Sequence, residues 1–223
     1  ANTSGDGEPS RSAPVTQIIE GIYQLLTPFP QFTFEQAKQL RIELAEKPRV
    51  TKGLPYVMPY MVKGGGETML IDCGWNTDDA YSALETGMKE HGSHPNEITK
   101  LFITHVHPDH YVMAGRLKQL ATLDLVIHEK DAEVINSRYF SPKALTDEMG
   151  GFMERNGVPP MESPTMARGS MGMLGHVSPA PPDTQVHGGE VIKIGDFDFE
   201  IIWTPAIHND VTPDQILVHA HEG

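Results

Sequence analysis

The chain has 223 residues, of which 39% are hydrophobic and 21% charged, and its formal net charge is −13 with neutral histidines. This composition indicates a globular chain of one or two domains, and it excludes a wholly disordered protein. No apolar run approaches the roughly 20 residues of a membrane-spanning helix, so we expect no membrane association. The acidic balance repels polyanions, so we expect no nucleic-acid partner.

The N-terminal residues and the cysteine content bear on the compartment. Residues 1–14 are polar and rich in Gly, Ser and Pro, which predicts a flexible tail ahead of a single domain over residues 15–223. They lack the basic start and apolar stretch of a signal peptide. The one cysteine, Cys73, excludes an internal disulfide and fits a reducing compartment. We therefore expect a cytoplasmic protein.

The first foldable segment follows this tail. Residues 15–26 predict two short strands broken at Gly21. Residues 33–36 have the form of a capping box and predict the start of a helix, which Pro48 ends because proline cannot donate the next backbone hydrogen bond.

The glycines that follow allow two interpretations. Residues 56–74 predict two strands joined by a turn at residues 64–66. A phosphate-binding loop is the alternative, but it requires Lys and then Ser or Thr after the last glycine, whereas Glu67 stands there. The sequence therefore favours a β-hairpin.

Helices and strands then alternate. We expect a helix from about Thr77 with Asn76 as its cap, a strand over residues 100–105, a helix from about Asp109, and a strand over residues 123–128. The residues expected on the buried faces of the two helices are Ala80, Leu84 and Met88, then Met113, Leu117 and Leu120. This alternation predicts an α/β layered domain.

Residues 129–182 interrupt the alternation and predict a helical insertion. One helix is expected to start at Ser141 and Pro142 and to stop at Gly157. Its expected apolar face consists of Leu145, Met149, Phe152 and Met153, and Met161, Met166, Met171 and Met173 follow among Pro and Gly. The methionines favour adaptable core filling, and a lid over a substrate pocket is the alternative. Beyond the insertion, residues 188–205 predict a hairpin that turns at Gly195 and Asp196.

The motif that carries the chemistry occupies residues 104–110, Thr-His-Val-His-Pro-Asp-His. His105 and His107 follow a strand at the edge where open α/β sheets bind ligands, and Asp109 and His110 start the next helix. Four such side chains in six residues can surround one or two metal ions, and imidazole with one carboxylate suits zinc best, with manganese or iron as alternatives. The other interpretation is a solvated turn.

This motif, the strand end Leu-Ile-Asp-Cys-Gly at residues 70–74 and the strand end Trp-Thr-Pro at residues 203–205 resemble the metallo-β-lactamase superfamily of hydrolases. The resemblance implies an αββα sandwich, incomplete at the C-terminal end and carrying the helical insertion. It assigns His105 and His107 to the first metal, and Asp109 and His110 to the second. It also implies that a metal-bound hydroxide, oriented by Asp109, attacks the substrate. Asp72 would lie behind the metals, although from the residues alone it could equally cap a strand end.

The remaining ligands are less well defined. The superfamily places a third histidine of the first metal in a Thr-Pro-Gly-His turn, whereas this chain has His208 one residue later, so His208 is the candidate and a surface histidine the alternative. Only 18 residues follow Pro205. Asp210, His219 and His221 are candidates for the bridging carboxylate and the last histidine. A shortened chain, self-association that completes the sheet, or a single-metal site would each account for this.

The resemblance implies a zinc-dependent hydrolase that acts on a small ester, lactone, thioester or β-lactam amide. A phosphodiesterase using the same site is the first alternative. A metal-binding remnant with little catalysis is the second.

Overall fold

The computed structural model describes residues 16–30, 56–162, 177–205 and 214–222. The expected tail over residues 1–14 and the helix expected from residues 33–36 lie outside these ranges. None of the helices within them is long and apolar enough to cross a membrane.

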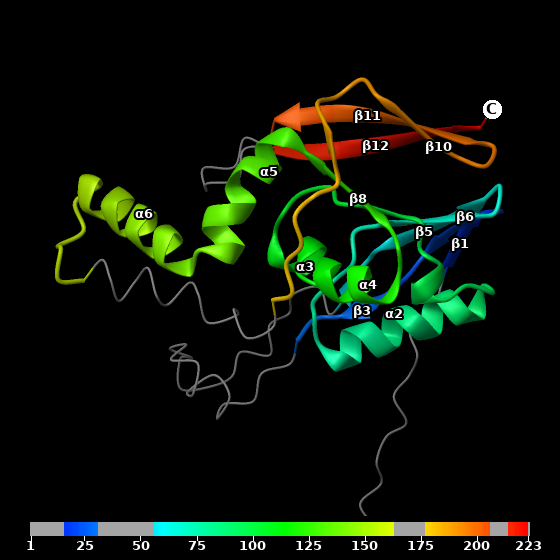
Figure 1. Ribbon diagram of the computed structural model, residues 1–223, viewed down its shortest axis with the longest axis horizontal. Coiled ribbons are helices and arrows are strands. Elements are labelled where there is room, and N and C mark those ends of the chain that lie inside the picture. Colours follow the sequence, from blue (N-terminus) through cyan, green and yellow to red (C-terminus); the bar gives the residue numbers. More distant parts are fainter. Residues whose placement is uncertain (1–15, 31–55, 163–176, 206–213, 223) are drawn as a thin grey trace, which may run out of the picture.

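A seven-stranded mixed sheet forms the centre of the molecule (Figure 1). Its strands in spatial order are β1 (Thr16–Ile19), β2 (Ile22–Gln24), β5 (Tyr60–Gly64), β6 (Glu67–Ile71), β7 (Lys100–Phe102), β8 (Asp124–His128) and β9 (Thr184–Val186). The first four pair antiparallel, and β6 to β9 pair parallel. The two short strands predicted over residues 15–26 are β1 and β2, which pair with each other, and the hairpin predicted over residues 56–74 is β5 and β6. The glycines at residues 64–66 turn the chain from β5 to β6, so the hairpin interpretation holds.

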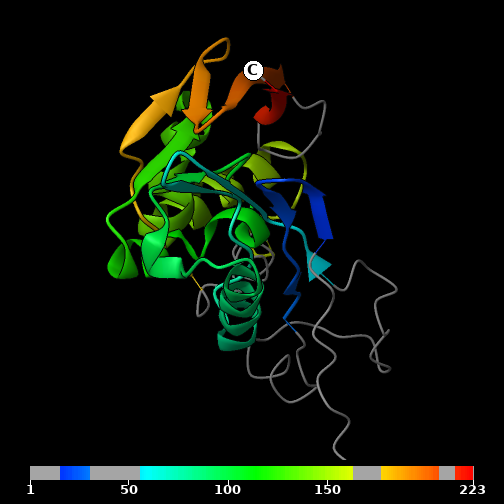
Figure 2. The ribbon, with the colours of Figure 1, turned by 90° about the vertical axis from the view of Figure 1, so that its right-hand side faces the viewer.

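Helices cover one face of this sheet. They are α2 (Asp78–Glu90), the 3-10 turn η1 (Pro95–Glu97), α3 (Pro108–Tyr111) and α4 (Ala114–Leu120). Side chains from α2 and α4, including Leu84, Met88 and Leu117, form one buried cluster with Leu101 and Leu125 of the sheet. Figure 2 shows α2 on the opposite side of the large sheet from the strands β10 to β12.

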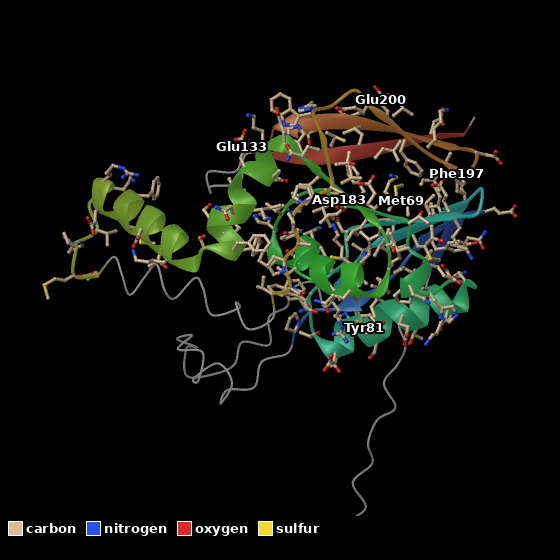
Figure 3. All side chains as sticks on the ribbon, viewed as in Figure 1. Met69, Tyr81, Glu133, Asp183, Phe197 and Glu200 are labelled. Atoms are coloured by element: carbon tan, nitrogen blue, oxygen red, sulfur yellow. The ribbon has the colours of Figure 1, made fainter. Side chains whose placement is uncertain are left out.

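A three-stranded antiparallel sheet packs on the other face. It consists of β10 (Val191–Ile194), β11 (Phe197–Pro205) and β12 (Asp214–Glu222). Phe199 and Ile201 of β11 are buried with Val62 and Met69 in a second cluster between the sheets, against which Phe197 packs, and Figure 3 shows Met69 and Phe197 there. A separate two-stranded ribbon joins β3 (Thr27–Pro28) to β4 (Tyr56–Val57). The described residues thus form three consecutive layers of the expected αββα arrangement, helices, sheet and sheet, and the α/β layered fold is confirmed.

Several element ends differ from the expectation. The cap of α2 is Thr77, whose hydroxyl accepts from the Ala80 N–H at 3.2 Å, and not Asn76. Strand β7 ends at Phe102, because the Thr104 N–H is taken by a side chain and not by a neighbouring strand. Proline at the first helical position starts α3 at Pro108, one residue earlier than expected.

The helix expected from Asp109 is in fact two helices. The chain breaks at Val112 and Met113, so the buried stripe of α4 runs through Ala114 and Leu117 to Ala121. Leu120 is therefore 45% exposed instead of buried.

The segment after β8 contains three helical pieces. They are α5 (Glu129–Ile135), the π-helical turn η2 (Asn136–Phe140) and α6 (Pro142–Arg155). Ser141 and Pro142 start α6 as predicted. Ile135 of α5 belongs to the helix-side core, whereas α6 projects away from the sheets (Figure 1). On α6, Met149 and Met153 are half-buried, Phe152 is 52% exposed, and the side chain of Leu145 lies outside the described part.

Candidate metal centre

The histidine motif lies in the connection between β7 and α3, at the carboxyl edge of the parallel strands. The Ile103 N–H still bonds to the Val126 carbonyl at 3.0 Å, but the chain then leaves the sheet. His107 is the N-cap of α3, so Asp109 lies in the first turn of that helix. A strand end followed at once by a helix start explains how four polar side chains can gather within six residues.

The structure brings these four side chains together. The ring of His105 lies 4.6 Å from that of His107 and 4.1 Å from that of His110, measured between centroids. Asp109 Oδ2 lies 3.4 Å from His110 Nε2. The interpretation of the motif as a solvated turn is not supported, because His105 is only 7% exposed.

Asp72 holds the motif from behind. It follows β6, and its carboxylate accepts hydrogen bonds from the Thr104 N–H at 2.8 Å and from the Thr104 hydroxyl at 2.8 Å. The same carboxylate contacts His110 Nδ1 at 2.7 Å, which leaves Nε2 of that ring directed to Asp109. An imidazole that donates one N–H to a carboxylate has its other nitrogen oriented for coordination. Asp72 therefore anchors the end of β7 and orients His110 at the same time.

Burial and charge set the protonation of the site. Burial, with the adjacent charge of His110, lowers the pKa of His105 to about 4, so this imidazole is neutral at pH 7. Burial opposes the charge on His110, but hydrogen bonds to Asp109 and Asp72 outweigh it and raise the pKa of His110 to about 10. Burial likewise opposes ionisation of Asp109, yet the hydrogen bond with His110 holds the pKa of that carboxyl below its usual value.

Three imidazoles and one carboxylate lie close together, and both are donor types that divalent metals bind in proteins. Within the residues described, no three His, Cys, Asp or Glu side chains as they stand form a group that could hold a metal ion. His208 and Asp210 lie outside the described ranges. Their assignments as ligands stay predictions.

The two C-terminal histidines lie on β12, a strand that the sequence did not predict. The register pairs His219 with Glu200 and His221 with Asp198, toward the turn at Gly195. The structure does not describe their side chains, so their roles also stay predictions.

Three further residues contact the site. The Thr104 hydroxyl bridges Asp72 and His105 Nδ1, and the Tyr139 hydroxyl donates to the carbonyl of Val106. Thr104 is the first residue of the motif, which is a usable signal, whereas nothing in the local sequence marks Tyr139. Cys73 is buried, its thiol donates to the His110 carbonyl at 3.1 Å, and burial raises its pKa well above the usual range, as expected of a core residue.

The layered α/β fold carries clustered histidines at a strand edge, and comparison with known proteins identifies the family. The sequence profile of the Metallo-beta-lactamase superfamily matches residues 53–212. The chain belongs to this superfamily.

Individual relatives have low sequence identity to this chain. The chain is 23% identical over 140 residues to an uncharacterized protein of Aquifex aeolicus, a match that covers 63% of this chain and 49% of that protein. It is 28% identical over 103 residues to ribonuclease Z of Archaeoglobus fulgidus, covering 46% of this chain and 30% of that protein.

Among solved structures, a metallo-beta-lactamase family protein from Thermus thermophilus has a similar fold. The TM-score is 0.61 at 23% identity, and the match covers 85% of this chain and 53% of that one. The chain thus spans about half the length of this protein and of the Aquifex relative, and less of the ribonuclease.

Proposed function

We propose that this chain is a zinc-dependent hydrolase of small carbonyl compounds, namely esters, lactones, thioesters or β-lactam amides. The observation that carries the proposal is the cluster formed by His105, His107, Asp109 and His110 in front of the carboxylate of Asp72. Membership of the superfamily points to metal-dependent hydrolysis. The reaction and the metal are the proposed part.

Each side chain is assigned a role, and for His110 that role requires the metal to displace the proton that Asp72 and Asp109 hold on its ring. His105 and His107 would hold one ion together with His208, and Asp109 and His110 would hold a second. His105 is neutral at pH 7, the form that a metal ligand requires. Asp109 is ionised at that pH, so its carboxylate can accept a hydrogen bond and orient an attacking water. When bound, zinc supplies a Lewis acid that polarises a carbonyl and lowers the pKa of water to roughly 7.

The substrate class rests on charge and on the segment after β8. A net charge of −13 disfavours polyanionic substrates. Phe152 on α6 and Met161 beyond it offer apolar surface, with Met161 91% exposed. Flexible apolar side chains of this kind suit a lid over a partly apolar small molecule.

The experiment is a hydrolysis panel with the zinc-loaded protein: a p-nitrophenyl ester, a lactone, a thioester and a β-lactam. We expect turnover of at least one of them, reduced by a factor of roughly 100 or more in His107→Ala, because a ligand is removed. His94→Ala is the matched control, since His94 is an exposed residue that starts η1. Turnover that survives in His107→Ala would contradict the site assignment. Bound zinc without turnover of any member would favour the metal-binding remnant.

A phosphodiesterase is the second candidate, and the similarity to a ribonuclease Z is the observation that favours it. Bis-p-nitrophenyl phosphate added to the same panel separates the two. Faster turnover of this diester than of every carbonyl substrate would favour the phosphodiesterase over the hydrolase of carbonyl compounds.

A further inference from the structure

A buried tyrosine outside the motif contacts the backbone between two of the proposed ligands. Tyr139 lies on the π-helical turn η2 and is 8% exposed. Its hydroxyl donates to the carbonyl of Val106, the residue between His105 and His107. This contact joins the turn between α5 and α6 to the centre of the motif.

The segment that receives this hydrogen bond belongs to no strand or helix. Residues 103–107 connect β7 to α3, and only Ile103, whose N–H bonds to the Val126 carbonyl, continues the sheet pairing among the described residues of this connection. Asp72 fixes Thr104 at one end, and the α3 N-cap fixes His107 at the other. Between them, the Val106 side chain is fully buried in the helix-side core, and its carbonyl is held by Tyr139. The peptide group between Val106 and His107 is thus held by a side chain, that of Tyr139.

The π-turn places Tyr139 where it can make this contact. The Ser141 N–H bonds to the Asn136 carbonyl at 2.8 Å, five residues back, which widens the turn. Single π-turns of this kind are frequently found at functional sites. The ring of Tyr139 also packs on Tyr111 of α3, at 5.0 Å between centroids.

Tyr111 of α3 also uses its hydroxyl to bond to backbone, in this case to Ala180. Its hydroxyl donates to the Ala180 carbonyl at 2.6 Å and accepts from the Ala180 N–H at 3.1 Å. Tyr111 is fully buried. The two tyrosines are thus alike in burial and in bonding to backbone, but only Tyr139 bonds between the proposed ligands.

We propose that Tyr139 is a positioning residue, whose hydrogen bond to the Val106 carbonyl holds His105 and His107 in the arrangement that binds the metal. This rests on the proposed function, because it assigns both histidines to the first ion. Removing the hydroxyl leaves a buried carbonyl without its donor and frees the peptide to rotate. We therefore expect removal of this hydroxyl to change the geometry of the metal ligands as well as the stability of the fold.

The test compares Tyr139→Phe with Tyr111→Phe. For each we would measure zinc affinity by competition with a chelator, the visible spectrum of the cobalt-loaded protein, and the melting temperature. We expect Tyr139→Phe to bind zinc roughly tenfold more weakly, as is usual when a residue behind a ligand is altered, and to shift the cobalt bands. Tyr111→Phe should lower the melting temperature to a similar extent while keeping the wild-type affinity and spectrum.

Two results would overturn the proposal: an unchanged affinity and spectrum in Tyr139→Phe, or equal changes in both variants. If Tyr139→Phe does not fold, 4-fluorophenylalanine at position 139 replaces it, because it keeps nearly the size of the tyrosine side chain and lacks the donor. An unchanged affinity in that protein would overturn the proposal equally.

A failure of the proposed function can be told apart from a failure of the role of Tyr139. In the first case the wild-type protein would bind neither zinc nor cobalt. In that case the NMR signals of the His105 and His107 rings in metal-free protein test Tyr139 directly. They should move in Tyr139→Phe and not in Tyr111→Phe, and unmoved signals would overturn the role.

Discussion

Asp72 shows how one residue accepts local strain to build the site. Its φ is +59°, in the left-handed region that few residues other than glycine adopt. Such a conformation costs on the order of 1–3 kcal/mol and persists only where the surroundings impose it. Here the carboxylate bonds to Thr104 and His110, both of which it reaches from the end of β6. These hydrogen bonds offset the cost of the strained backbone and hold the motif in place.

Replacing this carboxylate should change the titration of its partner. In metal-free Asp72→Asn we expect the pKa of His110 to fall from about 10, because one of the two carboxylates that favour its charged form is lost. NMR titration of the His110 ring measures this. Asp78→Asn is the matched control, because Asp78 pairs with Arg116 at the surface. A His110 that titrates as in the wild type would contradict the assigned contact.

The same shift predicts a pH dependence of stability. The pKa of His110 is raised in the folded protein, so its contribution is fully present below the unfolded value of roughly 6.5 and is lost as pH rises through about 10. Metal-free wild type should therefore lose free energy of unfolding across this window, and Asp72→Asn should lose less. Urea unfolding at pH 6 and pH 10 compares them. Parallel losses in both proteins would show that His110 is not the cause.

At the scale of residues, the sequence predicts the motif but not the residues that hold it in place. His105, His107, Asp109 and His110 are adjacent, so their spacing alone predicts a cluster. Asp72 is predictable only through the family resemblance, since its contacts cross from β6 to the end of β7. Tyr139 is not predictable, because its contact depends on a π-turn that no local pattern marks.

At the scale of elements, two glycine turns bring the two sheets into contact. Gly64 and Gly65 close the β5–β6 hairpin, and Gly195 closes the β10–β11 hairpin. A Cβ on Gly195 would lie 2.5 Å from the Gly64 Cα. The two hairpins can lie this close only because neither turn carries a side chain there.

Gly195→Ala and Gly66→Ala form a matched pair. Both glycines have positive φ, of 58° and 81°, so each alanine should cost roughly 1 kcal/mol in backbone strain. A Cβ at Gly66 meets nothing within 4 Å, whereas at Gly195 it meets backbone, and overpacking adds about 1–3 kcal/mol. Urea unfolding should therefore show a clearly larger loss for Gly195→Ala. Equal losses would mean that the two turns are not in contact.

Element types followed from the sequence better than element ends did. Glycine turns and apolar spacing predicted the strands β1 and β2, the hairpins at residues 56–74 and 188–205, and α2, because those signals are local. The end of β7 and the break between α3 and α4 depend on Asp72 and on packing around Met113, which spacing does not encode. The sequence did not predict strand β12. Residues 206–213 separate it from its partner β11, and pairing between separate segments leaves no local signal.

At the scale of the whole molecule, the large sheet carries a core on each face. Phe199 is 3% exposed between the sheets, whereas Phe152 on the projecting helix α6 is 52% exposed. We expect Phe199→Ala to lower the free energy of unfolding by about 3–5 kcal/mol and Phe152→Ala by less than about 0.5 kcal/mol. Denaturant unfolding measures both. A small effect of Phe199→Ala would show that the second sheet does not stabilise the first.

The central claim is that the histidine motif binds zinc in this chain, and metal stoichiometry by elemental analysis tests it most directly. The protein, purified with zinc and freed of excess ions, should contain one or two zinc ions per chain, and His107→Ala should contain measurably less. His94→Ala should match the wild type. A wild-type protein without zinc, or a His107→Ala protein with the same zinc content, would contradict the account.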